Sequence, residues 1–261
     1  MTVAAVIFDW GGTLSDFVDA EMVDAWRLAA RHLDPAHEDE LTARLVDVEA
    51  EFWATTSSHQ RSATLADLLA SAAEQVGLDV AEALLEEAAV RHLDAWTPHI
   101  HHDPDAVATL TTLRAAGIGI GMLSNTHWPR TFHEHFLERD GLAALIDVRL
   151  YTSEMAFQKP HPSAFLAATR ALGVDAEEAV FVGDRPWDDI AGARSTGMRT
   201  VLRPNPHAPD IAGIEPDARI ERLTELVDLV RRWSAERDGL GEDDAAGRRH
   251  DAGEETTEDH G

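Results

Sequence analysis

Four polar side chains follow short apolar runs of this sequence: Asp9, Ser124, Lys159 and Asp184. A carboxylate that attacks phosphorus needs Mg²⁺ to offset the charge repulsion, and Asp9 and Asp184 carry the oxygen ligands that Mg²⁺ prefers. Ser124 and Lys159 would then contact the phosphoryl oxygens, because phosphoryl transfer depends mainly on positioning and electrostatics. Ser, Asp and Gly also favour turns, so each position taken alone has a simpler explanation. The four together favour chemistry at one site.

Lys159 stands out by composition, because 21 of the 22 basic residues are arginine and it is the only lysine. An ammonium is a compact point charge on a flexible stem, whereas a guanidinium is a planar fork. A chance surface lysine remains the simpler alternative for this residue alone.

The elements that must position these side chains follow from hydrophobic patterning. Short runs rich in Val and Ile alternate with longer amphipathic stretches, which predicts parallel strands joined by helices. In such a sheet, ligands bind outside the carboxyl ends of the strands. The predicted fold class is therefore α/β, a doubly wound parallel sheet. We expect strands at 3–8, 117–123, 147–151, 179–183 and 199–202, and helices at about 104–116, 130–137, 162–172, 187–196 and 219–233.

An all-helical insert interrupts this alternation. It shows four helical patterns, near 17–33, 38–55, 63–76 and 80–95, and no strand-like run. We predict an α/β core at 1–15 and 97–233, with the helical insert at 16–96. The aromatic residues Trp26, Phe52, Trp53 and Trp96 are expected to form the insert's own small core. The histidine-rich segment 99–103 is expected to be a polar hinge back into the core.

Composition excludes several functional classes. The formal charge of −26 disfavours nucleic acid and anionic membrane surfaces as partners. No cysteine is present, which excludes disulfides and thiolate chemistry. Residues 234–261 carry ten acidic residues, three arginines and one large apolar side chain, so we expect a disordered acidic tail. No apolar run is long enough to span a bilayer and no basic leader precedes the first strand, so a cytoplasmic location is expected.

Four ordered motifs resemble those of the haloacid dehalogenase superfamily. They are DWGGTL at 9–14, LSNT at 123–126, QKPHPSAF at 158–165 and VGDRPWDDIAGARSTGM at 182–198. The resemblance covers residues 3 to about 203, and the ordered set is far more specific than any one motif. It implies a Rossmann-like core, and the helical insert resembles that family's cap, which closes over the site and selects substrate.

The resemblance also implies roles for individual residues. Asp9 would be the nucleophile, and the Gly11 carbonyl and the Asp184 carboxylate would bind Mg²⁺. Asp189 would orient the metal waters, with Asp188 as the weaker candidate for that position. Ser124 would bind phosphate and Lys159 would neutralise it as the second catalytic residue. Asn125 and Thr13 are added as phosphate-binding candidates.

Gly11 departs from the family pattern. Phosphatases of this family usually carry an aspartate there, which protonates the leaving group and later activates water. Its loss would slow a poor leaving group by roughly 10²- to 10⁴-fold, whereas acyl phosphates depend on it less. Asp16 and His127 are candidate substitutes, although a helix cap and a loop residue are the simpler interpretations. In the insert, His59 and Arg61 are candidate anion contacts, although a solvated turn between helices is the simpler interpretation.

Three functions stay open at this point. A Mg²⁺-dependent phosphatase acting on a small phosphorylated metabolite through an aspartyl-phosphate is the favoured hypothesis. A dehalogenase would also lack an aspartate at position 11, but it needs no acidic metal site. Loss of proton transfer could also leave a phospho-ligand or partner-binding module with little turnover. A lysine-dependent phosphonatase is disfavoured because the insert has no lysine. Substrate identity and oligomeric state do not follow from the sequence.

Overall fold

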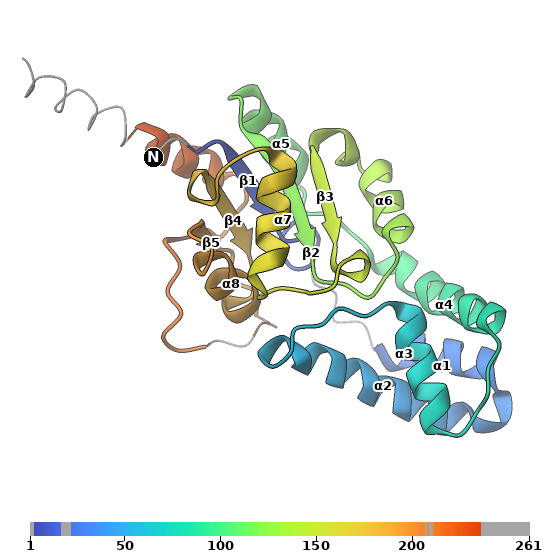
Figure 1. Cartoon of the computed structure of the whole chain (residues 1–261). Coiled ribbons are helices and arrows are strands. Elements are labelled where there is room, and N and C mark those ends of the chain that lie inside the picture. Colours follow the sequence, from blue (N-terminus) through green and yellow to red (C-terminus); the bar gives the residue numbers. More distant parts are fainter. Residues whose placement is uncertain (1–2, 17–21, 207, 209–210, 236–261) are drawn as a thin grey trace, which may run out of the picture.

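A six-stranded parallel sheet forms the centre of the protein (Figure 1). The computed structural model describes residues 3–16, 22–206, 208 and 211–235. The strand order is β3-β2-β1-β4-β5-β6, so that β1 lies between β2 and β4. The strands are β1 (Ala5–Phe8), β2 (Gly119–Ser124), β3 (Val148–Tyr151), β4 (Ala179–Gly183), β5 (Arg199–Leu202) and β6 (Ala218–Arg219).

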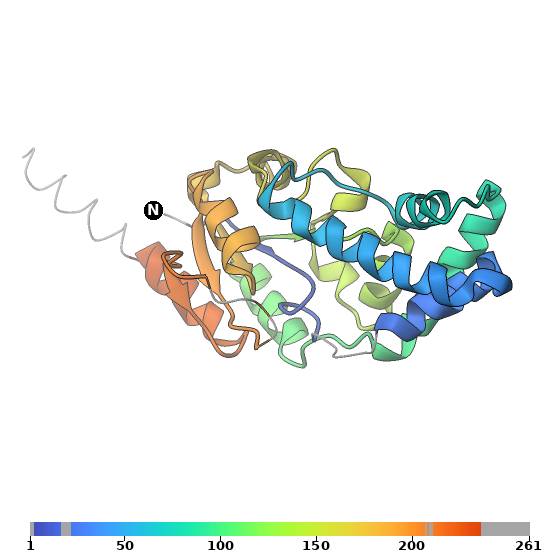
Figure 2. The same cartoon turned by 90° about the horizontal axis from the view of Figure 1, so that it is seen from below.

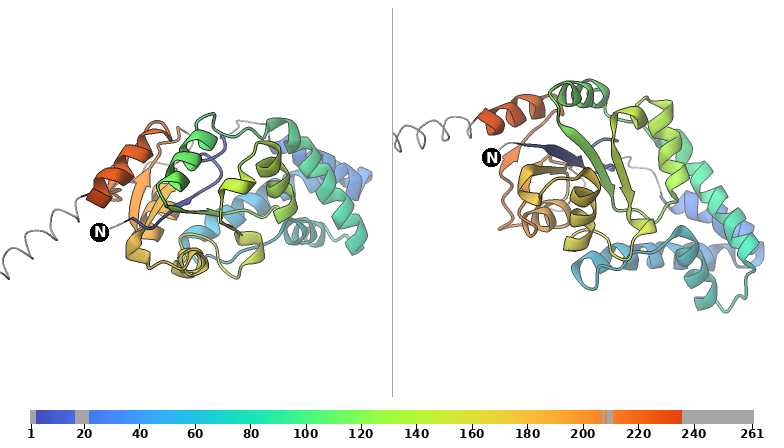
Figure 3. Two further views of the ribbon diagram at one scale, coloured as in Figure 1. Left: turned by 90° about the horizontal axis from the view of Figure 1, so that it is seen from above. Right: turned by 45° about the horizontal axis from the view of Figure 1, so that its top comes forward.

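Helices cover both faces of the sheet, as a doubly wound fold requires (Figure 3). Side chains of β1 alternate between two apolar clusters, because successive strand residues point to opposite faces. Val6 and Phe8 join a cluster with α5 (Ala106–Ala115), α6 (Arg130–Arg139) and a helix at 225–235. Ile7 joins the opposite cluster with α7 (Pro162–Leu172) and α8 (Gly192–Arg194). The predicted fold class is confirmed.

Four helices form a separate unit beyond the carboxyl ends of the strands (Figures 1 and 2). They are α1 (Met22–Leu33), α2 (Glu38–Ala54), α3 (Leu65–Gln75) and α4 (Glu82–Trp96). Their inner faces form an apolar cluster of their own, centred on Trp26, Leu41, Leu45 and Leu69. We call this unit the cap. Residues 17–21, the start of the first predicted helix, lie outside the described residues, and the exact domain boundaries stay a prediction.

Two chain segments cross between the cap and the core side by side. Ser15 and His102 form an antiparallel bridge, and the amide of Asp103 donates to the Leu14 carbonyl at 2.9 Å. The amide of Asp16 donates to the carbonyl of His101 at 2.8 Å. The segment 99–103 therefore pairs with residues 14–16 where the chain returns from the cap to the core, and its role as a hinge stays a prediction.

The predicted helix at 219–233 is wrong in its first part. Residues 218–219 form β6 instead, and the helix runs over 225–235. Asp217 explains the difference, because its carboxylate accepts hydrogen bonds from the Thr200 amide at 2.8 Å and hydroxyl at 3.0 Å and aligns the chain beside β5. The predicted tail began at 234, but residues 234 and 235 are helical, and the rest of the tail lies outside the described residues. No helix in the described part of the chain is long and apolar enough to cross a membrane.

Candidate active site

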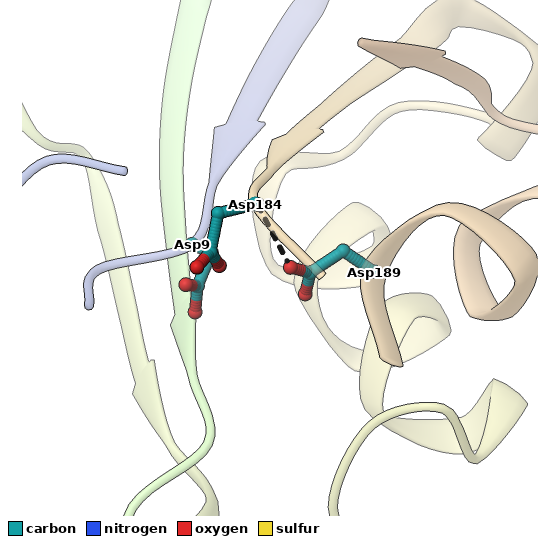
Figure 4. Close-up of side chains that lie close together, drawn as sticks. All are labelled: Asp9, Asp184 and Asp189. Carbon is teal, nitrogen blue, oxygen red and sulfur yellow. Dashed lines mark hydrogen bonds between the residues drawn. The ribbon is translucent and has the colours of Figure 1, made fainter. Parts of the chain in front are cut away.

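Three carboxylates meet at the carboxyl edge of the sheet (Figure 4). Asp9 follows β1, Asp184 follows β4, and Asp189 lies in a one-turn helical segment, Pro186–Ala191. The Asp9 amide donates to the Val182 carbonyl at 2.8 Å, so the pairing of β1 with β4 extends to the site. One oxygen of each carboxylate lies within 4.8 Å of the others. The strand-end placement inferred from the sequence is present in the fold.

Lys159 lies between two of these carboxylates. Its Nζ donates to Asp9 Oδ1 and to Asp189 Oδ1, each at 2.6 Å, and the residue is 1% exposed. The side chain of Asn125 holds the lysine backbone in place. Asn125 Oδ1 accepts from the Lys159 amide at 2.8 Å, and its Nδ2 donates to the Lys159 carbonyl at 2.9 Å. The only lysine of the chain is therefore an interior charge, not a surface residue.

Burial and mutual repulsion change the acidity of these groups. Burial raises the pKa of Asp9 to about 6, with Lys159 opposing the rise and Asp189 adding to it. Burial also raises the pKa of Asp184 to about 8, and the charges of Asp9 and Asp189 add to this shift. Burial alone would lower the pKa of Lys159, but Asp189 and Asp9 together raise it. The three carboxylates outnumber the one ammonium among them, so a bound cation would favour their ionised forms.

The three carboxylates fit a divalent cation. Asp184 Oδ1 is buried without a hydrogen-bond partner, and Asp184 Oδ2 accepts from Asn205 Nδ2 at 2.7 Å. An unpaired buried carboxylate oxygen beside two further carboxylates is the environment that Mg²⁺ satisfies. Gly12 adopts φ +78°, and a Cβ there would overlap the Asp184 carboxylate. The residue type at position 12 thus allows the nucleophile loop to approach the candidate metal ligand.

Asp189 and Asp188 differ in their surroundings. Asp189 Oδ2 accepts from the amides of Asp184 and Arg185 at 3.1 and 2.9 Å, so both of its oxygens are engaged. This suits a residue that orients its neighbours. Asp188 and Asp189 both line the adjoining cavity, but Oδ1 of Asp188 is buried without a partner.

The predicted phosphate contacts separate into two groups. Ser124 and Asn125 line the cavity next to Asp9 and Lys159. Thr13 is fully buried and is not among the lining residues, and its carbonyl accepts from Arg203 Nη1 at 2.6 Å. The Thr13 hydroxyl is buried without a hydrogen-bond partner, and its contact with phosphate stays a prediction.

The position of the missing aspartate is open in space. Nothing lies within 4 Å of a Cβ built on Gly11. Both candidate substitutes, Asp16 and His127, line the cavity. His127 is buried with neither ring nitrogen hydrogen-bonded, and burial lowers its pKa to about 3. A neutral His127 is a poor proton donor at neutral pH.

The cavity extends from Asp9 to the cap and has a volume of about 580 Å³. Its walls carry four tryptophans: Trp10, Trp53, Trp96 and Trp128. The expectation that all four aromatics of the insert form its own core is wrong for Trp96. Trp26 and Phe52 are buried in that core and Trp53 packs against it, although Trp53 also lines the cavity, as Trp96 does.

The sequence also misled us at the loop between α2 and α3. His59 and Arg61 are exposed and do not line the cavity, so the solvated turn, the simpler interpretation of this segment, agrees with the structure and the candidate anion contact does not. Arg61 stacks over Phe157 at 5.8 Å from the ring centroid, and its carbonyl accepts from Gln158 Nε2 at 3.3 Å. This loop therefore docks the cap on the segment that leads to Lys159.

Glu49 was missed by the sequence reasoning. It lies on α2, lines the cavity and is 6% exposed. One signal was available, because Glu49 is four residues after Leu45 and three before Phe52, on the apolar face of the helix. An acidic residue on an apolar helix face indicates a special environment.

Comparison with known proteins identifies the family. A family model described as a haloacid dehalogenase-like hydrolase matches residues 3–197. The chain belongs to this family. It is therefore a hydrolase of the haloacid dehalogenase-like type, with the family core and a helical unit after the first motif.

Relatives of this hydrolase include two kinds of enzyme. A glyceraldehyde 3-phosphate phosphatase of Methanopyrus kandleri is 32% identical over 88% of this chain and 97% of its own length. An (S)-2-haloacid dehalogenase of a Pseudomonas species is 29% identical over 88% of this chain and 97% of its own. Among solved structures, a 2-haloacid dehalogenase of Pseudomonas syringae has a TM-score of 0.66 at 28% identity, with coverage of 89% of this chain and 100% of that one. Similarity alone thus leaves phosphatase and dehalogenase chemistry to be separated by the site.

Proposed function

We propose that this hydrolase is a Mg²⁺-dependent phosphatase that acts on a small phosphorylated metabolite through an aspartyl-phosphate intermediate. The observation that carries the proposal is the cluster of Asp9, Asp184 and Asp189 around the single ammonium of Lys159. A dehalogenase that attacks carbon has no need of this acidic excess. A phosphatase-named relative that aligns along 97% of its own length supports the same choice.

Each residue has a role in this mechanism. Asp9 attacks phosphorus, and Lys159 holds the Asp9 carboxylate through the 2.6 Å contact and offsets charge on the phosphoryl group. Ser124 donates to a phosphoryl oxygen from the end of β2. Asp184, Asp9 and the Gly11 carbonyl would hold Mg²⁺, with Asp189 as a positioning residue. The ion, when bound, offsets the negative charge that otherwise repels the phosphate from the nucleophile.

The absence of an aspartate at position 11 limits the substrates. Leaving groups that need no proton, such as the acetate of acetyl phosphate, depend least on a general acid. The proposal therefore gives acyl phosphates faster turnover than alkyl esters, unless a substrate binds so that another group supplies the proton.

A dehalogenase is the second candidate, favoured by Gly11 and by dehalogenase-named relatives. It would need a cation to hold the carboxylate of a 2-haloacid. Two permanent cations line the cavity in the described structure, and both already face carboxylates: Lys159 contacts Asp9 and Asp189, and Arg185 lies 3.6 Å from Asp188. The cap side chains that line it, Glu49, Trp53 and Trp96, add no further cation. This composition weighs against a haloacid substrate.

The test is a phosphate-release screen with acetyl phosphate and sugar phosphates, run with Mg²⁺ and with a chelator. We expect Mg²⁺-dependent release by the wild type and a loss on the order of 10³-fold or more in Asp9→Asn. Asp188→Asn is the matched control, because Asp188 is an acidic residue that lines the same cavity but lies outside the carboxylate cluster. Halide release from a 2-haloacid without Mg²⁺, and no phosphate release, would contradict the proposal.

A further inference from the structure

The cap end of the cavity contains a buried carboxylate without a cationic partner. Glu49 has a side chain that is 7% exposed, and its Oε2 accepts a hydrogen bond from Trp26 Nε1 at 2.6 Å. Within the described part of the chain, the basic nitrogen nearest to Glu49 in ion-pair range is His127 Nε2, 3.7 Å from Oε1. Burial lowers the pKa of His127 to about 3, so this imidazole is neutral at physiological pH. The negative charge of Glu49 is therefore not offset by a protein cation.

Burial of the Glu49 carboxylate costs free energy, and a positively charged ligand can offset this cost. Burial raises the pKa of Glu49, against hydrogen bonds from the indoles of Trp26 and Trp53. A buried ionised carboxylate is stabilised most by an opposite charge a few ångströms away. A positively charged ligand beside Glu49 would therefore gain more than a neutral ligand of the same shape.

Indole rings surround the same region. Trp128 contacts Trp96 with ring centroids 5.2 Å apart and Trp10 at 6.4 Å, and all three line the cavity. The faces of indoles attract cations, and aromatic surroundings with a carboxylate are suited to ammonium groups. Arg185 already lies 5.7 Å from the Trp53 ring centroid, but Asp188 is 3.6 Å from its guanidinium and offsets that charge. Glu49, by contrast, has no such cation among the described residues, and it lines the same cavity as Trp96 and Trp128.

We propose that the substrate is a phosphate monoester whose alcohol carries a positively charged ammonium group. This rests on the proposed phosphatase function. The phosphate lies against Asp9, Ser124 and Lys159, and the ammonium lies at the cap end between Glu49 and the indoles. A substrate with a carboxylate at that end is disfavoured, since Glu49 would repel it. The cavity volume of about 580 Å³ accommodates a ligand of this size together with a metal ion.

A matched pair of substrates tests the proposal in the wild-type protein. Choline phosphate and 3,3-dimethylbutyl phosphate have the same shape, and a carbon replaces the charged nitrogen in the second. We expect kcat/KM for choline phosphate to be about tenfold higher or more, from cation–π and carboxylate attraction in a desolvated site. Equal values for the two esters would overturn the proposal, even if acetyl phosphate is hydrolysed rapidly.

Two variants test whether Glu49 causes the preference for the charged ester. Glu49→Gln should reduce the ratio of kcat/KM for choline phosphate to kcat/KM for 3,3-dimethylbutyl phosphate about tenfold, toward one. Glu51→Gln is the matched control, because it removes a carboxylate from the same helix at an exposed position and should leave the ratio unchanged. A ratio that survives in Glu49→Gln, with circular dichroism like that of the wild type, would contradict the role of this residue.

Calorimetry separates the ammonium site from the phosphatase function, because binding needs no turnover. The wild type should bind choline at least tenfold more tightly than 3,3-dimethylbutanol. If no phosphate ester or acyl phosphate is hydrolysed but this preference is present and depends on Glu49, the proposed function fails and the ammonium site stands. If both alcohols bind equally or neither binds, the ammonium site is wrong, whatever the phosphatase assay shows.

Discussion

Lys159 is the residue on which the charges of the site depend. Its ammonium is the basic group that contacts both Asp9 and Asp189 in the described structure, and it is 1% exposed. Because removal of one partner of a buried ion pair leaves an uncompensated charge, such changes are usually costly. The same contact keeps the Asp9 carboxylate in place for attack.

Lys159→Met should therefore destabilise the metal-free protein by about 3–5 kcal/mol in urea unfolding at neutral pH. Asp189→Asn removes one of the two carboxylates that Lys159 contacts. The double variant should lose less stability than the sum of the single losses, by about 1 kcal/mol or more. Additive losses would show that the two side chains do not interact as the 2.6 Å contact indicates.

Gly11 is the residue that limits proton transfer in our account. A Cβ at this position meets nothing within 4 Å, and Gly11 is not among the residues with positive φ. Gly11→Asp should therefore fold with a stability within about 0.5 kcal/mol of the wild type.

Its expected effect is on chemistry. Hydrolysis of alkyl phosphate esters should rise by about 10²-fold, while hydrolysis of acetyl phosphate should change much less, because a general acid helps a poor leaving group most. Steady-state kinetics on both substrates measures the difference. Unchanged ester hydrolysis would mean that another group already supplies the proton.

At the scale of elements, the cap is attached to the core through the start of α3. The Thr64 hydroxyl accepts from the Asp67 amide at 3.2 Å, and the Asp67 carboxylate accepts from the Thr64 amide at 2.8 Å. The next amide, of Leu65, donates to the carbonyl of His127 at 2.6 Å. The helix cap and the contact between the two units are thus neighbours in the chain.

Thr64→Ala should lower the free energy of unfolding by about 1 kcal/mol, because it removes a helix cap. Thr111→Ala is the matched control: this threonine is exposed inside α5, where its hydroxyl donates to the Val107 carbonyl at 2.7 Å. Alanine favours a helix interior, so the control should be neutral or slightly stabilising. Equal effects of the two substitutions, measured by urea unfolding, would argue against the cap.

Sequence patterning predicted those helices and strands in which the apolar residues repeat with one clear period. The five longer strands of the sheet and the four cap helices were found because their apolar residues repeat with a clear period. β6 was missed because two residues carry no period, and its alignment depends on Asp217 and Thr200, which are distant in sequence. The segment Pro186–Ala191 was recognised as a helix, although its wider, π-helical turn at Asp189 was not.

At the scale of the whole molecule, cap and core together enclose the cavity. The positions of Asp9, Ser124 and Asp184 could be predicted from the sequence, because each follows a strand and the carboxyl ends of parallel strands lie at one edge of the sheet. The cap wall was not predictable in the same way. Whether Trp96 packs inside the cap or faces the core depends on how the two units dock, and helical periodicity does not contain that information.

Three buried histidines give stability a specific pH dependence. Burial lowers the pKa of His92, His127 and His133 to about 3, from an ordinary value of 6.5. Below about pH 6.5 the unfolded chain binds protons that the folded protein excludes, so stability is present above that pH and is lost as pH falls toward 3.

His92→Leu removes one of these groups. Between pH 6 and 5, its free energy of unfolding should fall less steeply than that of the wild type, by about 1 kcal/mol per pH unit. His135→Leu, an exposed substitution on α6, is the control for a change of histidine content. Urea titrations at several pH values measure the slopes. Parallel slopes for the wild type and His92→Leu would contradict a neutral buried His92.

The central claim is that the phosphoryl group is transferred to Asp9. The most direct test is to quench the wild type with acid while it hydrolyses acetyl phosphate that is radiolabelled in the phosphoryl group, with Mg²⁺ present. Because no aspartate stands at position 11 to activate water, the phosphoenzyme should accumulate. We predict label on the peptide that contains Asp9 and none in Asp9→Asn. Two results with the wild type would contradict covalent catalysis by Asp9. One is label on a different peptide, and the other is phosphate release without any labelled protein.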